Sequence, residues 1–486
     1  MYKLISRLNN NRIIIPIIVF IAVFIRIYFF VGHIFSDDAY YSKLSQIILT
    51  NEPISQYQGY PIFKLRLLFI LGNSLIMKVF GVKEVSTIIL PFIFSILNLF
   101  LVYIFAKKLF NNKTSLIAMI LVAFFPTDVV FATISFPDSI NVFLINLGLL
   151  FLYKATTQNN LMYSIAAGFL FSFSLLFKEN LIYYFTALLI ILSFTIIKKD
   201  KSSALIFISL LIIVLFFLLE SFTYKLFTGN FLYRYSILEE NYKYSFYDFF
   251  PYSVQKLTHS NNYVQNLALQ IILNLKYIFL RRFYLFLPLI ALIISFINIF
   301  RKENLLISIF FLLLSSLLIL FTTDLTFYRP LNLERSWYFF PLLLPSVLVA
   351  SVFLEKLKFR YILPILLLYL VGSLNMTTVY QQYFNREINS EIKYFISKDK
   401  THKIYTDHFT KYSIDLLSGD DTTAINFSDK FIDENLIDKN SYLLYNEKHI
   451  DELNLQGYKF LGLSELLVNN VTLINSFGDF KIYKKK

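Results

Sequence analysis

Charged and turn residues divide this sequence into about eleven apolar runs, each close to the length that crosses a lipid bilayer. A membrane-spanning helix needs about 20 predominantly apolar residues. The sequence therefore predicts an all-α bundle with about eleven transmembrane helices. The runs lie near residues 13–32, 86–106, 114–130, 138–153, 161–177, 181–197, 204–223, 283–300, 305–322, 337–354 and 361–379.

The stretch 161–197 is interrupted only by Lys178, Glu179 and Asn180. As one helix it would be about 55 Å long at 1.5 Å per residue, well beyond the thickness of a bilayer. We therefore expect two spans joined by a tight turn at 178–180.

Composition agrees with a lipid environment and excludes several kinds of function. The chain is 57% hydrophobic and 16% charged, a balance that a water-soluble surface could hardly accommodate. It has no Cys, which excludes disulfides, thiolate metal sites and a Cys nucleophile. The net charge of +13 is distributed between apolar runs rather than gathered on one folded face, so we expect no nucleic-acid partner.

Basic residues are distributed unevenly between the two predicted sides of the membrane. The outer connections 126–137, 178–180 and 323–336 carry none, one and two of them. By the positive-inside rule we expect a cytoplasmic N-terminus, in a plasma or cytoplasmic membrane. The first span has no small-residue cleavage site after it, so we expect it to be retained. The residues assigned to the cytoplasmic side are Lys3, Arg7, Arg12, Lys107, Lys108, Lys113, Lys154, Lys198, Lys199, Lys201, Arg301, Lys302, Lys356, Lys358 and Arg360.

Three regions fall outside the spans on the predicted outer side. Residues 33–85 show apolar residues at helical spacing, which favours helices in the membrane interface. Residues 224–282 are rich in Tyr and are expected to rest on the membrane. Residues 381–486 are more charged and contain strand-like runs, which predict a small extracytoplasmic α/β domain after a transmembrane domain 1–380. The expected strands are 403–406, 441–445 and 480–483.

The charged residues nearest the apolar runs gather on this outer side. Charges at membrane depth are costly, so their placement tends to serve function. Both signs at one depth suit transfer from a phosphorylated lipid: Lys and Arg neutralise the departing phosphate, and a carboxylate deprotonates the acceptor hydroxyl. The residues are Asp37, Asp38, Asp138, Lys178, Glu179, Arg281, Arg282 and Arg335.

Each of these residues also has a structural alternative. Asp37, Asp38 and Asp138 precede helical segments and would serve equally well as helix caps. Lys178 and Glu179 fit a solvated turn, and the three Arg residues fit contacts with ordinary lipid phosphates. Arg26, near the outer end of the first span, is expected to extend its charged end to the interface.

We expect no metal and no cofactor. The five His residues show no ligand spacing, and there is no Gly-rich phosphate loop.

Several segments together resemble the GT-C glycosyltransferases of the protein O-mannosyltransferase and aminoarabinose transferase group. In that group an Asp, often followed by a second acidic residue and a Tyr, opens the first outer loop, as SDDAYY does here. Oligosaccharyltransferases, another GT-C branch, typically carry a Trp-Trp-Asp signature, and the only Trp here is Trp337. We therefore set that branch aside. The similarity covers most of 12–354, through the segments 26–49, 59–81, 86–110, 125–138, 175–180 and 334–351.

The resemblance implies an inverting, metal-independent transfer of a sugar from a polyprenyl-phosphate carrier to a hydroxyl of a protein, lipid or glycan. It implies that Asp37 is the catalytic carboxylate and that Asp38 assists it. It further implies that Lys178 and Arg335 face the donor phosphate and that Asp138 lines the acceptor side. Glu179, Arg281 and Arg282 are expected among the substrate-binding residues.

Two other functions use similar residues. A transporter or flippase of lipid-linked sugars would need polar residues near the midplane and paired repeats with broken helices, and neither is evident in the sequence. A hydrolase of the same lipid would pass the sugar to water.

Overall fold

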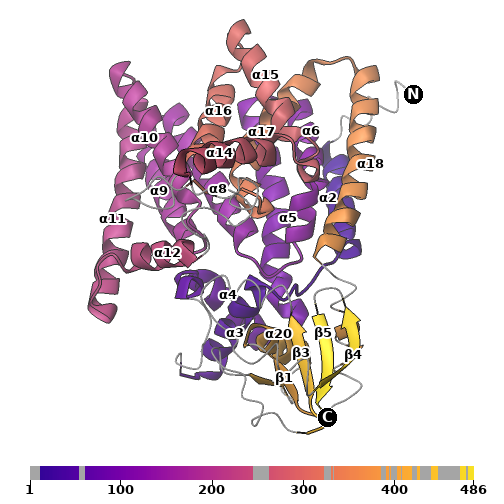
Figure 1. Ribbon diagram of the computed structural model, residues 1–486. Helices are drawn as coiled ribbons and strands as arrows, with labels where there is room; N and C mark the ends of the chain where they lie inside the picture. The colour runs from indigo at the N-terminus through magenta and orange to yellow at the C-terminus, as the bar shows by residue number, and fades with distance from the viewer. Residues whose placement is uncertain are drawn as a thin grey trace.

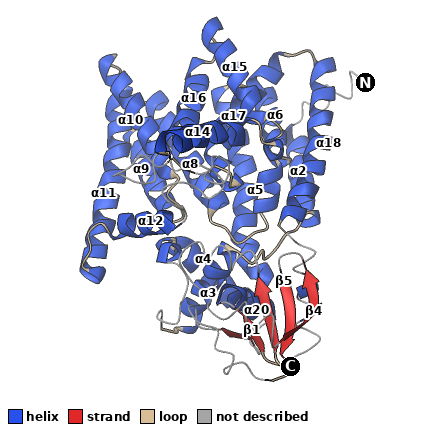
Figure 2. Cartoon of the chain, viewed as in Figure 1, coloured by secondary structure: helices blue, strands red, loops and turns tan. Residues whose placement is uncertain are grey.

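The structure is a computed structural model of the 486-residue chain (Figure 1). It describes residues 11–53, 61–244, 262–321, 330–331, 333–384, 390–392, 394–395, 402–406, 408–418, 424–426, 439–446, 471–477 and 480–485. Helices form one large bundle, and a small β-sheet lies at one end of it (Figure 2).

Every predicted span corresponds to an apolar helix of the bundle. Five of these helices are long and apolar enough to cross a membrane, and a bent pair brings the number to six. The other predicted spans are apolar helices of 10–17 residues, so the structure does not fix the count at eleven. The helices are α2 (Asn11–Tyr28), α5 (Glu84–Leu109), α6 (Asn112–Ala123), α8 (Asp138–Gln158), α9 (Leu161–Leu175), α10 (Leu181–Ile197), α11 (Ser202–Thr228), α15 (Leu287–Arg301), α16 (Leu305–Leu320), α17 (Phe340–Lys356) and α18 (Phe359–Tyr383).

The third predicted span, 114–130, is wrong as a single helix. Helix α6 ends at Ala123, and a separate short helix, α7 (Pro126–Phe131), follows. Pro126 explains the break, because a proline disfavours helical geometry in the residue before it and starts a new helix well. Residues 126–137, expected to be only a short connection, are buried from Pro126 to Phe136.

The Tyr-rich region 224–282 contains more helix than its composition indicated. Its described residues form α12 (Tyr233–Tyr244) and the apolar helix α14 (Tyr263–Phe279). A 3-10 turn, η3 (Arg282–Tyr284), follows α14, and the chain bends by 116° before α15.

The first outer region forms the predicted helices. They are α3 (Asp37–Thr50), the 3-10 turn η2 (Pro61–Leu65) and α4 (Leu67–Phe80). Helix α3 ends where Asn51 takes the left-handed conformation, with φ of 55°, and its N–H bonds to the carbonyl of Ile47. In Figure 1 α3 and α4 lie below the bundle, at the end where the sheet lies.

The C-terminal region contains a five-stranded mixed sheet in the order β2-β1-β3-β5-β4. The three strands predicted from the sequence are β1 (Ile404–Thr406), β3 (Tyr442–Asn446) and β5 (Phe480–Lys485). Two strands were missed, β2 (Ala424–Asn426) and β4 (Val471–Phe477). β1 pairs in parallel with β2 and β3, whereas β5 pairs antiparallel with β3 and β4. The helix α20 (His408–Ser418) completes the described α/β elements.

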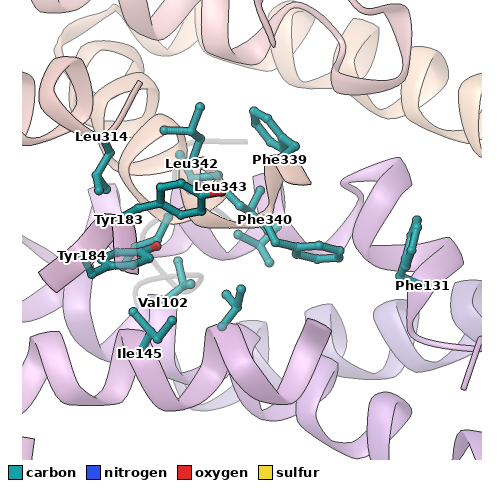
Figure 3. Close-up of a cluster of buried hydrophobic side chains, with 14 of the residues drawn as sticks. Val102, Phe131, Ile145, Tyr183, Tyr184, Leu314, Phe339, Phe340, Leu342 and Leu343 are labelled. Atoms are coloured by element: carbon teal, nitrogen blue, oxygen red, sulfur yellow. The ribbon is translucent and has the colours of Figure 1, made fainter. Parts of the chain in front are cut away.

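Helix α17 occupies the centre of the bundle, with nearly all of its residues from Phe340 to Val352 buried. Figure 3 shows its N-terminal residues packed among side chains from α5, α8, α10 and α16. The hydroxyl of Tyr184 donates to the carbonyl of Pro341 at 2.7 Å. Pro341 sits in the first turn of α17, where its missing N–H leaves no helical bond unmade.

Candidate active site

The loop that precedes Asp37 is held in place by bonds from several distant segments. The amide of Val31 donates to the Thr133 hydroxyl, and that of Gly32 to the Thr133 carbonyl, both at 3.0 Å. The amide of His33 donates to the Glu84 carboxylate at 2.8 Å. Gly32 has φ of +80°, and a Cβ there would lie 2.3 Å from the Glu84 Oε1. The sequence therefore needs glycine at this position.

The two acidic residues at the start of α3 have different environments. Asp38 is fully buried, and its carboxylate accepts from the amides of Ile34 and Ser36, each at 2.7 Å. Its Oδ2 also lies 2.8 Å from the His33 Nδ1. Asp37, by contrast, is partly exposed. The carboxylate of Asp38 thus closes the loop, whereas Asp37 remains accessible.

Asp138 and Lys178 form a direct ion pair at this end of the bundle. The Lys178 Nζ donates to the Asp138 Oδ1 at 2.6 Å. Asn141, one turn into α8, donates to the carbonyls of Ser174 and Lys178 at 2.8 and 2.9 Å. These amide bonds fix the turn between α9 and α10, and Asp138 fixes the ammonium group that projects from it.

Glu179, the next residue of that turn, binds two arginines. Arg66, at the start of α4, and Arg234, on α12, both donate to the Glu179 Oε1, the latter at 3.0 Å. Arg234 also binds Glu220 near the end of α11 through two nitrogens. Burial lowers the pKa of the Arg234 guanidinium, but the two carboxylates more than offset this, so its pKa lies above the ordinary value.

Tyr41 connects these groups to Asp37. It is buried on α3, outside the spans, and the Arg66 side chain hydrogen-bonds to its hydroxyl. Burial raises the pKa of Tyr41; the Arg66 charge lowers it, and the Asp37 and Asp138 charges raise it further. Tyr41 is therefore within electrostatic reach of all three residues. We call Asp37, Tyr41, Arg66, Asp138, Lys178 and Glu179 the outer charge cluster.

The other predicted arginines, Arg281, Arg282 and Arg335, each contact an aromatic ring. Arg335 lies over the Trp337 ring at 5.3 Å, and Lys178 lies over the adjacent Tyr338 ring at 5.7 Å. Arg281 donates to the carbonyl of Glu334. Arg282 lies over the Phe283 ring at 5.6 Å and is exposed. Arg335 and Lys178 thus contact the rings of two consecutive residues, whereas Arg282 packs against Phe283.

The expected position of Arg26 is wrong. Its side chain is fully buried instead of reaching the interface. Its guanidinium donates to Asp128 at 2.5 Å and to Ser95 at 2.8 Å. Its remaining bonds go to the carbonyls of Ala22 and Ala123, each at 3.1 Å. Arg26 therefore joins α2, α5, α6 and α7.

Sequence reasoning missed several charged partners. Arg66, Arg234, Glu220 and Asp128 were not singled out. Asp128 had a usable signal, because an acidic residue two positions after Pro126 in an apolar context requires a buried partner. Arg234 and Glu220 are 14 positions apart, and no local pattern pairs them.

Comparison with known proteins agrees with this architecture. Residues 68–219, about a third of the chain, match the sequence model of the family described as dolichyl-phosphate-mannose-protein mannosyltransferase. This segment contains Asp138, Lys178 and Glu179 and begins after Asp37 and Arg66. A search of curated proteins found no match.

Solved structures match almost the whole chain. ArnT from Cupriavidus metallidurans, in a structure bound to undecaprenyl phosphate, is 10% identical, with a TM-score of 0.61 over 96% of this chain and 97% of that chain. The chain has a GT-C fold. This confirms the resemblance that the sequence suggested, and the apolar helices make the chain an integral membrane protein.

The fold likeness extends to the oligosaccharyltransferase branch. An oligosaccharyltransferase from Archaeoglobus fulgidus is 13% identical, with a TM-score of 0.56 over 97% of this chain and 73% of that chain. A structure of the enzyme AglB from the same organism, in complex with an inhibitory peptide and a dolichol-phosphate, has 12% identity, a TM-score of 0.53 and coverage of 96% and 74%. The GT-C fold therefore does not by itself choose between branches.

In the described ranges no three His, Asp or Glu side chains are grouped in a way that could hold a metal ion. Metal-independent chemistry remains an expectation from the sequence.

Proposed function

We propose that this protein transfers a sugar from a polyprenyl-phosphate carrier to a hydroxyl group of a protein, lipid or glycan. The observation that carries the proposal is the outer charge cluster, in which Lys178 pairs with Asp138 at 2.6 Å and Arg66 pairs with Glu179. The charges of the partly exposed Asp37, of Arg66 and of Asp138 all act on the buried Tyr41 of this cluster. The fold likeness to ArnT and AglB, whose structures contain undecaprenyl phosphate and dolichol-phosphate, supports a lipid-phosphate donor.

In this proposal Asp37 is the general base. Its carboxylate takes the proton of the acceptor hydroxyl as the oxygen attacks the anomeric carbon of the sugar. The bond between that carbon and the phosphate oxygen breaks, and its electron pair leaves with the polyprenyl phosphate. Attack from the side opposite the leaving group inverts the anomeric configuration.

Lys178 stabilises the charge that develops on the departing phosphate. Its ion pair with Asp138 holds the ammonium group in one place before the donor binds. We therefore assign Asp138 to positioning Lys178, in addition to the acceptor-side role that the family resemblance implies. Arg335 lies over the ring next to the one that Lys178 contacts and is proposed to bind the same phosphate.

Asp38 is proposed to support Asp37 indirectly. Because its carboxylate binds the amides of Ile34 and Ser36, it shapes the loop that leads into Asp37. Glu179 is proposed to orient Arg66, which in turn contacts Tyr41. No cofactor is required by this scheme.

We also propose that the reaction takes place on the extracytoplasmic face. The ends of α6, α15 and α17 opposite the outer charge cluster carry the pairs Lys113–Glu355 and Lys356–Glu303. Of the basic residues assigned to the cytoplasm, Lys154 lies near the end of α8 away from Asp138, and Lys198 follows the end of α10 away from Lys178, which supports the orientation.

The fate of a labelled sugar tests the proposal. Purified protein in vesicles is given polyprenyl-phosphate sugar labelled in the sugar, together with a membrane and cell-envelope extract as acceptor. The expected result is label on an extract component and release of polyprenyl phosphate. Label moved intact across the bilayer would instead identify a flippase, and free labelled sugar in water would identify a hydrolase.

A further inference from the structure

The loop before Asp37 supplies one residue to the core of the C-terminal α/β domain. Phe35 is 5% exposed, and its ring lies 5.2 Å from that of Phe480 on β5, edge to face. Among the described residues, the other buried members of this core come from beyond residue 390. They are Ile392, Ile404, Ile414, Leu444, Phe480 and Ile482.

The backbone around Phe35 is arranged to direct its ring into this core. Phe35 has φ of +52°, a conformation in which a bulky residue is uncommon. The amides on either side, those of Ile34 and Ser36, both bind the carboxylate of Asp38. The strained residue is therefore clamped between two fixed amides, and its burial offsets the strain.

A second contact joins the same domain to α3. The rings of Tyr40 and Tyr412, the latter on α20, are 6.3 Å apart. The Lys43 ammonium lies 5.9 Å from the centre of the Tyr412 ring. In Figure 1, α20 and the sheet lie beside α3. The C-terminal domain thus holds the segment around Asp37 from both sides, through Phe35 before it and Tyr40 after it.

We propose that Phe35 is a positioning residue through which the C-terminal domain sets the orientation of the Asp37 carboxylate. The inference rests on the role of Asp37 in the proposed function. It assigns the C-terminal domain a part in the rate of transfer through a contact two residues from the general base. A carboxylate that must lie within hydrogen-bond distance of the acceptor hydroxyl is sensitive to a shift of its loop, since misplacement by 1 Å can cost about 10²-fold in rate.

Phe35→Gly tests this directly. Glycine accepts a positive φ without strain, so the variant keeps the backbone conformation accessible and removes only the anchoring ring. At saturating donor we expect kcat per monodisperse protein to fall about tenfold or more, with KM for the donor within about twofold of wild type. Phe35→Leu, which refills the core, is expected to recover most of the loss. Wild-type kcat in Phe35→Gly would overturn the proposal.

Two further variants separate anchoring from general destabilisation. Phe480→Ala removes the other half of the ring contact and is expected to reproduce the kcat loss, and the double variant with Phe35→Gly is expected to be no worse than the poorer single variant. Leu444→Ala opens the same core away from the loop. It is expected to lower the unfolding temperature while retaining kcat, and a kcat loss equal to that of Phe35→Gly would contradict the positioning role.

Hydrogen exchange of the peptide covering 31–38 gives a readout that does not depend on the proposed reaction. Faster exchange is expected in Phe35→Gly and Phe480→Ala and unchanged exchange in Leu444→Ala. If wild-type protein transfers no sugar, the proposed function fails while this measurement still tests the anchor. Unchanged exchange in Phe35→Gly would refute the anchor itself.

Discussion

The chain contains two groups of charged side chains that differ in their exposure to solvent. In the Arg26–Asp128 pair the side chains are 0% and 1% exposed, and every nitrogen of the Arg26 guanidinium has an acceptor. In the outer charge cluster the side chains of Lys178 and Glu179 are 14% and 20% exposed. The first pair is closed to solvent, whereas the second group is open enough for the proposed substrate to replace a protein partner.

The Arg26–Asp128 pair has a structural role, whereas the outer charge cluster is the proposed site of the reaction. Arg26 joins four helices and bonds the carbonyl of Ala123 at the end of α6, so its bonds hold the break between α6 and α7. That break leads to Thr133, which binds the loop before Asp37. The Arg26–Asp128 pair therefore helps to hold the loop before Asp37 in place and takes no part in the proposed reaction.

The largest expected effect is on stability, from Arg26→Met. This change leaves the Asp128 carboxylate buried without its guanidinium, which costs about 3–5 kcal/mol in comparable cases. Thermal unfolding in detergent measures the loss. The double variant with Asp128→Leu removes both charges and should recover much of it, while Arg360→Met, at an exposed position, should change little. A mild effect of Arg26→Met alone would show that the pair is not structural.

A smaller effect, on activity, is expected from Lys178→Met. Loss of the ammonium group removes stabilisation of the departing phosphate, so kcat should fall about 10²- to 10³-fold. The unfolding temperature should also fall, because the buried Asp138 loses its partner, but by less than in Arg26→Met, since the Lys178 side chain is 14% exposed and that of Arg26 is 0% exposed. Lys154→Met, at the other end of α8, is the matched control and should leave transfer unchanged. Equal activity of the two variants would remove Lys178 from the mechanism.

The smallest effect is expected at the exposed pair Glu303–Lys356. The hydrogen bond from Lys356 and its charge lower the pKa of Glu303, which is exposed. A carboxyl whose folded pKa is depressed contributes stability above its unfolded pKa and loses it as the pH falls through the folded value. Glu303→Gln should therefore lower the unfolding temperature slightly near neutral pH and not at all in strong acid. A decrease in unfolding temperature as large as that of Arg26→Met would show that the exposed pair stabilises the fold as much as the buried pair does.

Much of the bundle could be predicted from the sequence because its signals are local. Apolar runs of span length and the charges between them gave the helices, and strand-like runs gave three of the five strands. The break at Phe124 and Phe125 was missed, although Pro126 marks it, because apolar residues continue on both sides of the short segment from Pro126 to Asp128. Strand β2 has three residues and no clear alternation, so its pairing with β1 depends on the tertiary structure.

The sequence predicted on which side of the bundle the charged residues of the candidate site lie, but not which of them pair with one another. The sequence placed Asp138 and Lys178 on one side of the membrane, and the structure joins them over 40 positions. It could not place Arg66 opposite Glu179, which is 113 positions away, or Phe35 against Phe480. Such contacts depend on how the helices pack and on where the C-terminal region lies against them, and no periodicity within one segment predicts them.

In the proposed mechanism Asp37, and not its buried neighbour Asp38, is the general base. Transfer of labelled sugar from polyprenyl phosphate in vesicles by Asp37→Asn and Asp38→Asn, each with its unfolding temperature, tests this assignment. We expect Asp37→Asn to keep the wild-type unfolding temperature and to lose about 10²- to 10⁴-fold in kcat. We expect Asp38→Asn to lower the unfolding temperature as well as the activity. Near-normal transfer by folded Asp37→Asn would rule out Asp37 as the general base.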